Sequence, residues 1–193
     1  SSILRATGNQ VDEEYYVNDQ GRQIEILSLS VWLRYLMVFN QINLFPNNCY
    51  QGTYIVELAE ELKRDYGEKF SITKEIEDQI SQMLQLDMEE EALDGLISQS
   101  REALNESFDE IKSFVLNRIL KNIEGDLKDF GVKHNSWFKE STMFRADKDK
   151  TPLINKALDS LEAKKQLYEK DGALWFKSTD FGDEKDRVVK REN

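Results

Sequence analysis

Residues 15–24 read YYVNDQGRQI, and this stretch decides the fold that the sequence predicts. Tyr15 to Val17 is a short β-prone run, and the polar residues 18–21 that follow it are typical of a turn. Asp19 is a suitable N-cap for a helix. Helical spacing then begins, because apolar residues recur on one face at Ile24, Leu27, Val31, Trp32, Tyr35, Leu36 and Phe39. A strand, a polar turn and a helix in direct succession are typical of nucleotide-binding α/β folds.

The turn is the first candidate site. Gly21 has no Cβ, so its backbone can adopt a positive φ or approach a ligand closely. The first turn of a helix offers unpaired N–H groups and a positive dipole end, which suit an anion. If Asp19 begins the helix, Asp19 and Gln23 lie four positions apart on one face and can hold a polar ligand together. The alternative, that the turn only caps the helix, stays open.

The middle of the chain is predicted to be helical. Periodicity and end signals predict a helix over 53–66 that ends at Gly67, and another over 73–88. A longer helix is predicted from about residue 91 or 101 to 130, with Gly131 as its end.

The last third changes character. Residues 132–138 are predicted to form a strand, and Thr151 with Pro152 begins a helix to Gln166. The apolar positions that this helix is expected to bury are Ile154, Ala157, Leu158 and Leu161. Two strands, 173–178 and 186–190, are predicted to form a hairpin around residues 180–184. The predicted class is therefore helix-rich α/β or α+β.

The negative charge is concentrated in one region. The 193 residues carry a net charge of -11, and residues 52–110 contain 17 acidic and 5 basic residues. A chain this acidic is repelled by nucleic acid over most of its surface, although a local basic face remains open. The acidic region is interpreted either as a solvated helix face or as a docking surface. Residues 88–91 lack the spacing of an EF-hand, so no metal site is predicted.

The low numbers of cysteine and histidine, and the lack of certain motifs, exclude several kinds of site. Cys49 and His134 are the only cysteine and histidine, which is too few for a zinc site of the Cys/His type. A lone cysteine allows no internal disulfide and favours a cytoplasmic location. The longest apolar run, 31–39, is interrupted by Arg34, so no membrane span is predicted. The triplet 180–182, Asp-Phe-Gly, lacks the other kinase motifs and is interpreted as turn geometry.

A second candidate site residue is Glu140. It follows the aromatic end of the predicted strand at Trp137 and Phe138. A carboxylate beside aromatic side chains suits a cationic substrate group. The alternative interpretation is an acidic residue in a surface loop.

Several motifs together resemble the bacterial arginyl-tRNA synthetases. They are residues 15–24 (YYVNDQGRQI), 45–46 (FP), 50–55 (YQGTYI), 130–132 (FGV), 137–141 (WFKES), 171–179 (DGALWFKST) and 181–189 (FGDEKDRVV). Each motif is weak alone, but they occur in the family's order over nearly the whole chain. The acidic middle resembles the variable insertion between them.

The resemblance implies an ATP-dependent ligase that activates L-arginine, with Mg²⁺, and transfers it to tRNA-Arg. It implies a partial class I, Rossmann-type catalytic domain with a helical insertion. Residues 1–50 are expected to be catalytic-domain strand–turn–helix, 51–130 the acidic helical insertion, and 131–193 a further α+β part of the catalytic domain with a C-terminal hairpin.

Two family motifs are absent from this sequence. Neither His-Ile-Gly-His nor Lys-Met-Ser-Lys-Ser occurs, and both grip the phosphates of ATP in the family. The chain is therefore expected to be an internal piece that is monomeric, inactive alone and without bound ATP. The alternative is a free-standing acidic helical interaction domain that derives from a synthetase or mimics one.

The family also implies roles for single residues. Asn18, Asp19 and Gln23 are expected to border the pocket for arginine and its adenylate. Glu140 is expected to face the ammonium or guanidinium group and to act by charge, so no residue of this chain is predicted to be catalytic.

Overall fold

The computed structural model describes residues 1–85, 90–146 and 151–191. Two compact units divide the chain, one of residues 1–137 and one of residues 138–193. Each unit is described by itself below. The predicted helix 73–88 and the acidic run 88–91 extend partly into residues 86–89, which lie outside the described residues.

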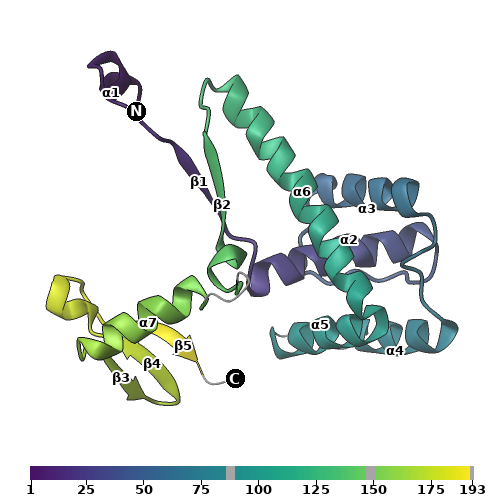
Figure 1. Cartoon of the computed structure of the whole chain (residues 1–193). Helices are drawn as coiled ribbons and strands as arrows, with labels where there is room; N and C mark the ends of the chain where they lie inside the picture. Colours follow the sequence, from purple (N-terminus) through teal and green to yellow (C-terminus); the bar gives the residue numbers. More distant parts are fainter. Residues whose placement is uncertain (86–89, 147–150, 192–193) are drawn as a thin grey trace. The chain divides into compact units, whose positions relative to one another are not determined.

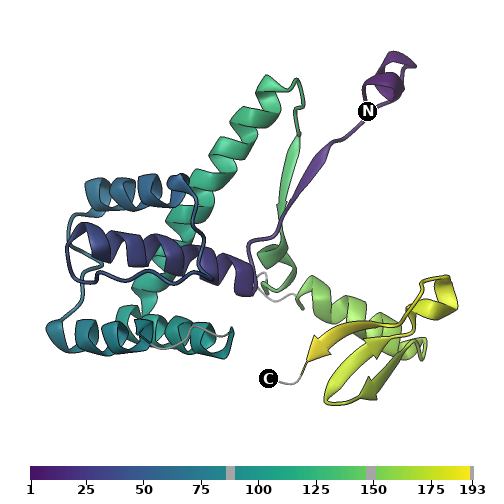
Figure 2. The same ribbon diagram turned by 180° about the vertical axis from the view of Figure 1, so that it is seen from behind.

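The first unit is mainly helical. Its elements, in chain order, are α1 Ser2–Ala6, β1 Glu14–Val17, α2 Arg22–Val38, α3 Thr53–Tyr66, α4 Lys74–Leu84, α5 Glu90–Leu104, α6 Glu106–Asp129 and the start of β2 Ser136–Lys139. Strands β1 and β2 form a two-stranded sheet. Figure 1, and Figure 2 from behind, show α2 between α3 on one side and α5 on the other, with α6 crossing it.

The central helix α2 is buried on all sides, whereas the sequence predicts a single apolar face. Six consecutive residues, 28–33, are buried, two of them serines. The serine hydroxyls donate to backbone carbonyls one turn earlier, Ser28 to Ile24 at 2.7 Å and Ser30 to Ile26 at 2.6 Å. These bonds satisfy the hydroxyl groups of that stretch, so the helix can contact α3, α5 and α6 at once.

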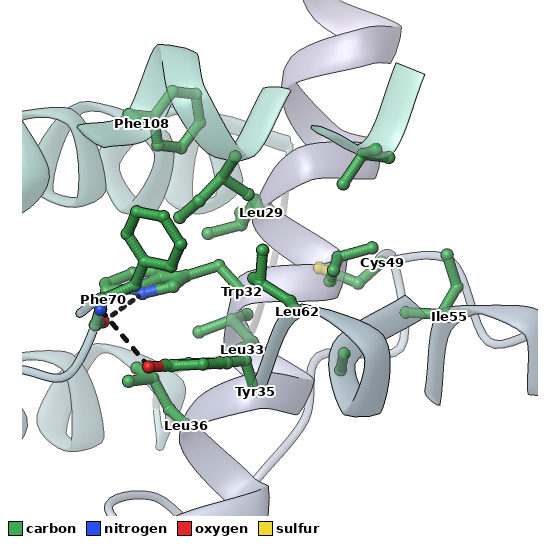
Figure 3. Close-up of a cluster of buried hydrophobic side chains, with 14 of the residues drawn as sticks. Leu29, Trp32, Leu33, Tyr35, Leu36, Cys49, Ile55, Leu62, Phe70 and Phe108 are labelled. Carbon is green, nitrogen blue, oxygen red and sulfur yellow. Dashed lines mark hydrogen bonds between the residues drawn. The ribbon is translucent and has the colours of Figure 1, made fainter. Parts of the chain in front are cut away.

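The loop after α3 is held to the core by hydrogen bonds from two aromatic side chains (Figure 3). Trp32 Nε1 donates to the carbonyl of Phe70 at 2.9 Å. The hydroxyl of Tyr35 accepts from Phe70 N–H at 3.2 Å and donates to the carbonyl of Gly67 at 2.6 Å. The core thus satisfies the backbone of Phe70, whose side chain it also buries.

The helix predictions hold for α3 and partly for the rest. Helix α3 has the predicted bounds, and Gly67 follows it with φ 60. Helix α4 begins at Lys74 with Thr73 as its N-cap, one residue after the predicted start. For the longer helix, the start at residue 91 is wrong, because α5 and α6 are separate helices, and the alternative start at residue 101 is five residues before α6 begins. The predicted end is confirmed within one residue, and Gly131 has φ 78. Asn105 between α5 and α6 has φ 49 and ψ −126, which no helix accommodates.

The second unit is a small α+β arrangement. Its elements are the end of β2, the 3₁₀ helix η1 Glu140–Met143, α7 Leu153–Ala163, β3 Leu167–Lys170, β4 Ala173–Phe176, the 3₁₀ helix η2 Ser178–Phe181 and β5 Arg187–Arg191. The sheet is antiparallel in the order β3-β4-β5, with a register shift in the β4–β5 pair between Leu174 and Trp175. The predicted hairpin is confirmed as β4 and β5, whereas β3 is not predicted.

The predicted burial of α7 is wrong. Pro152 is the N-cap, one position later than predicted, and no residue of α7 is buried. Among the described residues of the second unit, only Ser141 and Ser178 are buried, and both are polar. One short helix and three short strands provide too little apolar area to bury side chains completely.

The helix-rich class is confirmed, since 57% of the chain is helical. The sheets are small, and a Rossmann-type arrangement stays a prediction. No helix among the described residues is both long and apolar enough to cross a membrane.

Candidate functional site

The turn between β1 and α2 differs from the prediction. The N-cap of α2 is Gly21, with φ 86, so the helix begins at Arg22 rather than near Asp19. The N–H of Asp19 donates to the carbonyl of Val17 at 3.1 Å, and Asp19 is only 6% exposed. The prediction that Asp19 caps the helix is wrong, and with it the premise that Asp19 and Gln23 share a helix face. The positive φ that Gly21 was expected to permit is confirmed.

A cavity of about 270 Å³ lies beside this turn. One side consists of β1, the turn and the start of α2, including Asn18, Gln20 and Gln23. The other side is apolar and comes from α6, with the side chains Leu116, Ile119, Leu120 and Ile123. The structure therefore brings Asn18 and Gln23 to one cavity, and Asp19 is not among its lining residues. An amide-bearing wall opposite an apolar wall suits a ligand with an aliphatic chain and a polar end.

Tyr50 also lines the cavity, and its role is not predicted from the sequence. Its hydroxyl donates to Gln23 Oε1 at 3.0 Å. Its backbone N–H donates to Ser30 Oγ at 3.0 Å, so α2 positions both partners. The sequence feature that could have identified Tyr50 is the motif 50–55. This motif is part of the family resemblance, but the resemblance assigns no pocket role to Tyr50.

A second hollow of about 340 Å³ adjoins the same pair of residues. Gln23 and Tyr50 line it together with Arg22, Asn48 and Cys49, among others. Arg22 is held by Asp94, with Nε 2.6 Å from Oδ1, and the pKa of Arg22 is raised mainly by that bond. Burial raises the pKa of the Cys49 thiol, which disfavours the thiolate and fits an apolar core residue better than a nucleophile.

Glu140 belongs to the second unit. It is the first residue of η1 and is half-buried, and Ser141 next to it is buried. The structure does not determine its position relative to the cavity, so it does not bring Glu140 together with Asn18 and Gln23.

The acidic region contains several ion pairs. Arg118 on α6 contacts Glu61 at 2.9 Å and Asp65 at 2.7 Å, and Lys69 contacts Glu110 at 2.5 Å. Within the described residues, no group of three or more His, Cys, Asp or Glu side chains could hold a metal ion. These pairs lie between partly exposed side chains, and both interpretations of the acidic region stay predictions.

Comparison with known proteins tests the family resemblance that the sequence motifs indicate. No family model matches the chain. The arginine–tRNA ligase of Acinetobacter baumannii (strain AYE) is 41% identical over 208 residues, which cover 100% of this chain and 34% of that protein. The arginine–tRNA ligase of Nitrosomonas eutropha is 42% identical over 198 residues, covering 100% of this chain and 33% of that protein.

These homologues are arginine–tRNA ligases. The chain spans about a third of the length of the curated relatives that it matches. A solved structure from Campylobacter jejuni, provisionally assigned as an arginyl-tRNA synthetase, superposes with a TM-score of 0.67 at 29% identity. The superposition covers 98% of this chain and 34% of that one. The resemblance that the motifs indicate is thereby confirmed.

Proposed function

We propose that this chain is part of an arginine–tRNA ligase, which activates L-arginine with ATP and Mg²⁺ and transfers it to tRNA-Arg in the cytoplasm. The observation that supports this most is 41% identity over the entire chain to proteins of that name. In the intact protein, the segment contributes to a Rossmann-type catalytic domain. Its three parts are 1–50 and 131–193 of that domain and the helical insertion 51–130.

The cavity beside the turn forms one wall of the arginine pocket. The amide side chains of Asn18 and Gln23 offer donors and acceptors to the polar groups of arginine, and Tyr50 fixes the orientation of Gln23. The apolar side of α6 accommodates the methylene groups of the substrate. Asp19 supports the turn from inside, and Glu140 contributes negative charge toward a cationic group of arginine.

ATP needs groups that this cavity does not offer. None of its lining residues is lysine, arginine or histidine, so it does not fit a triphosphate. The two phosphate-gripping motifs of the family are also absent from the sequence. The chain alone is therefore expected to be inactive, and its residues act by positioning the amino acid. It is also expected to be monomeric.

An exchange assay tests this function. Arginine-dependent ATP–pyrophosphate exchange is measured with tRNA present, on this chain and on the intact product of its gene. The intact product is expected to exchange and the chain is not, and calorimetry is expected to show weak or no arginine binding to the chain. Exchange that responds to another amino acid would refute arginine as the substrate. An intact product without exchange would refute the ligase assignment and favour an acidic interaction domain.

A further inference from the structure

Another cavity in the first unit lies outside the two described above. It has a volume of about 270 Å³ and is formed by the last turns of α6 and by residues 132–137. We call it the α6–β2 pocket. Its apolar wall is Leu127, Val132 and Trp137, and its polar lining is Lys128, Lys133 and His134 with one acidic residue, Glu124. This volume suits a single ring system rather than a large ligand.

The aromatic wall of the pocket is held in place. Trp137 stacks on Tyr15 with the ring centres 4.6 Å apart. His134 meets both rings edge-on, at 5.4 Å from Tyr15 and 5.9 Å from Trp137. The pocket therefore presents a rigid aromatic surface, which a ligand does not need to order on binding.

His134 carries a polar atom that the fold leaves unsatisfied. Its Nδ1 is buried and has no hydrogen-bond partner among the described residues. Buried polar atoms of this kind are rare, because burial removes their bonds to water.

An exposed ring adjoins the pocket. Phe130 is 89% exposed, although it lies in sequence between the lining residues Lys128 and Val132. The turn that carries it is fixed by backbone bonds, since Gly131 N–H donates to Lys128 O at 3.0 Å and Val132 N–H to Leu127 O at 2.8 Å. The ring thus stands in water on a well-defined turn.

The charge of this part of the first unit differs from that of the rest of the chain. Residues 111–137 contain five basic and three acidic residues, whereas residues 52–110 contain 5 basic and 17 acidic ones. Lys128 and Lys133 form no ion pair with any described residue. The lining of the pocket itself has two lysines and one glutamate, so it carries a net positive charge that favours an anionic partner.

We infer that the α6–β2 pocket and Phe130 together bind an unpaired nucleotide of RNA. The base stacks on Phe130 or enters the pocket against Trp137, and Lys128 and Lys133 contact the neighbouring phosphates. Aromatic rings interspersed with lysines are the usual means of holding single strands. The choice of RNA over DNA rests on the proposed function. A lipid surface fits less well, because the apolar residues line a pocket of one-ring size.

The test is fluorescence anisotropy of a labelled single-stranded octaadenylate titrated with the full 193-residue chain. The double variant K128E/K133E is expected to weaken binding at least tenfold. The affinity of the unchanged chain should fall with salt, with a logarithmic slope of about −1.4 for two phosphates in a single strand. Phe130→Ala should weaken binding about 5- to 150-fold, the range found when a stacking ring is removed.

Matched variants separate this site from net charge. Lys156 on α7 and Lys164 at its C-cap are exposed and do not line the pocket, so K156E/K164E changes the charge of the chain by the same amount without altering the pocket's lining. Phe144 is 53% exposed and serves as the control for Phe130. Both controls should bind the octaadenylate as the unchanged chain does.

Three outcomes would overturn the inference: unchanged affinity in K128E/K133E, an equal loss in K156E/K164E, or binding to phosphatidylserine vesicles without binding to RNA. The exchange assay on the intact protein reports separately on the proposed function. Exchange without octaadenylate binding rejects only the pocket, and octaadenylate binding without exchange rejects only the ligase assignment.

Discussion

Replacing Tyr35 by phenylalanine removes one oxygen atom from the core of the first unit. Tyr35 is fully buried, and its hydroxyl joins α2 to the loop after α3 through Phe70 (Figure 3). The same hydroxyl donates to the carbonyl of Gly67. Phe70 is 1% exposed, so its N–H cannot turn to water when the hydroxyl is gone. An unpaired buried donor costs ~1–3 kcal/mol. Gly67 is exposed, and water can replace the bond to its carbonyl.

We therefore expect Y35F to lower the free energy of unfolding by about 2 kcal/mol. The assay is urea denaturation of the full chain followed by circular dichroism at 222 nm. The midpoint should fall while the slope m stays constant. Tyr66→Phe is the control, because Tyr66 is 38% exposed and its hydroxyl makes no hydrogen bond to any described residue. A Y35F midpoint equal to that of Y66F would refute the reasoning.

The difference in stability between the unchanged chain and Y35F should also depend on pH in the alkaline range. Burial raises the pKa of Tyr35 above its ordinary value, so the unfolded chain ionises first as pH increases. The stabilisation is complete below the unfolded pKa of about 10 and is lost as pH rises toward the folded value. The difference in stability between the unchanged chain and Y35F should therefore narrow above that pH. A constant difference would contradict the assignment of this loss to Tyr35.

Three further predictions concern other parts of the chain. Two hydrogen bonds from Arg187 are the main cause that lowers the pKa of Asp183 to about 2, so its stabilisation is present above pH ~4 and lost toward pH 2. Thermal unfolding at several acidic pH values should show a flatter pH dependence in D183N, and an unchanged slope would contradict it. Asn105→Gly should stabilise the chain by ~1 kcal/mol in urea denaturation, since glycine relieves the strain at φ 49 and ψ −126; a lower midpoint would argue against strain. Gln23→Ala in the intact protein should raise the KM for arginine in the exchange assay, whereas the exposed Gln82→Ala should not, and an unchanged KM would remove Gln23 from the pocket.

The parts of the fold that the sequence predicts are those with local signals. Helix α3 is amphipathic and followed by Gly67, and its bounds agree with the prediction. The boundary between α5 and α6 carries no such signal, because the apolar spacing continues through it. Only the backbone of Asn105 shows that the helix stops there.

One element has a local signal that the prediction does not use. Asp171 and Gly172 both have positive φ and join β3 to β4, which is the two-residue hairpin that an Asp-Gly pair favours. The sequence prediction ends the preceding helix at Gln166 and assigns no element to the residues that form β3. A more complete use of turn chemistry would have found β3.

The candidate site is partly predictable for a different reason. Asn18 and Gln23 lie near one another in sequence, so a local motif identifies both. Tyr50 joins them only because the loop after α2 folds back on that helix, and the opposite wall comes from α6, about a hundred residues away. Such contacts depend on tertiary packing, which a motif does not encode.

The absence of any fully buried apolar side chain among the described residues of the second unit has a practical consequence. Segments with little burial open often, and proteases cleave open segments at their lysines and arginines. Limited trypsin digestion should therefore degrade residues 138–193 first. The fragment that survives longest should end near Trp137, which makes brief proteolysis a simple route to a shorter, crystallisable sample.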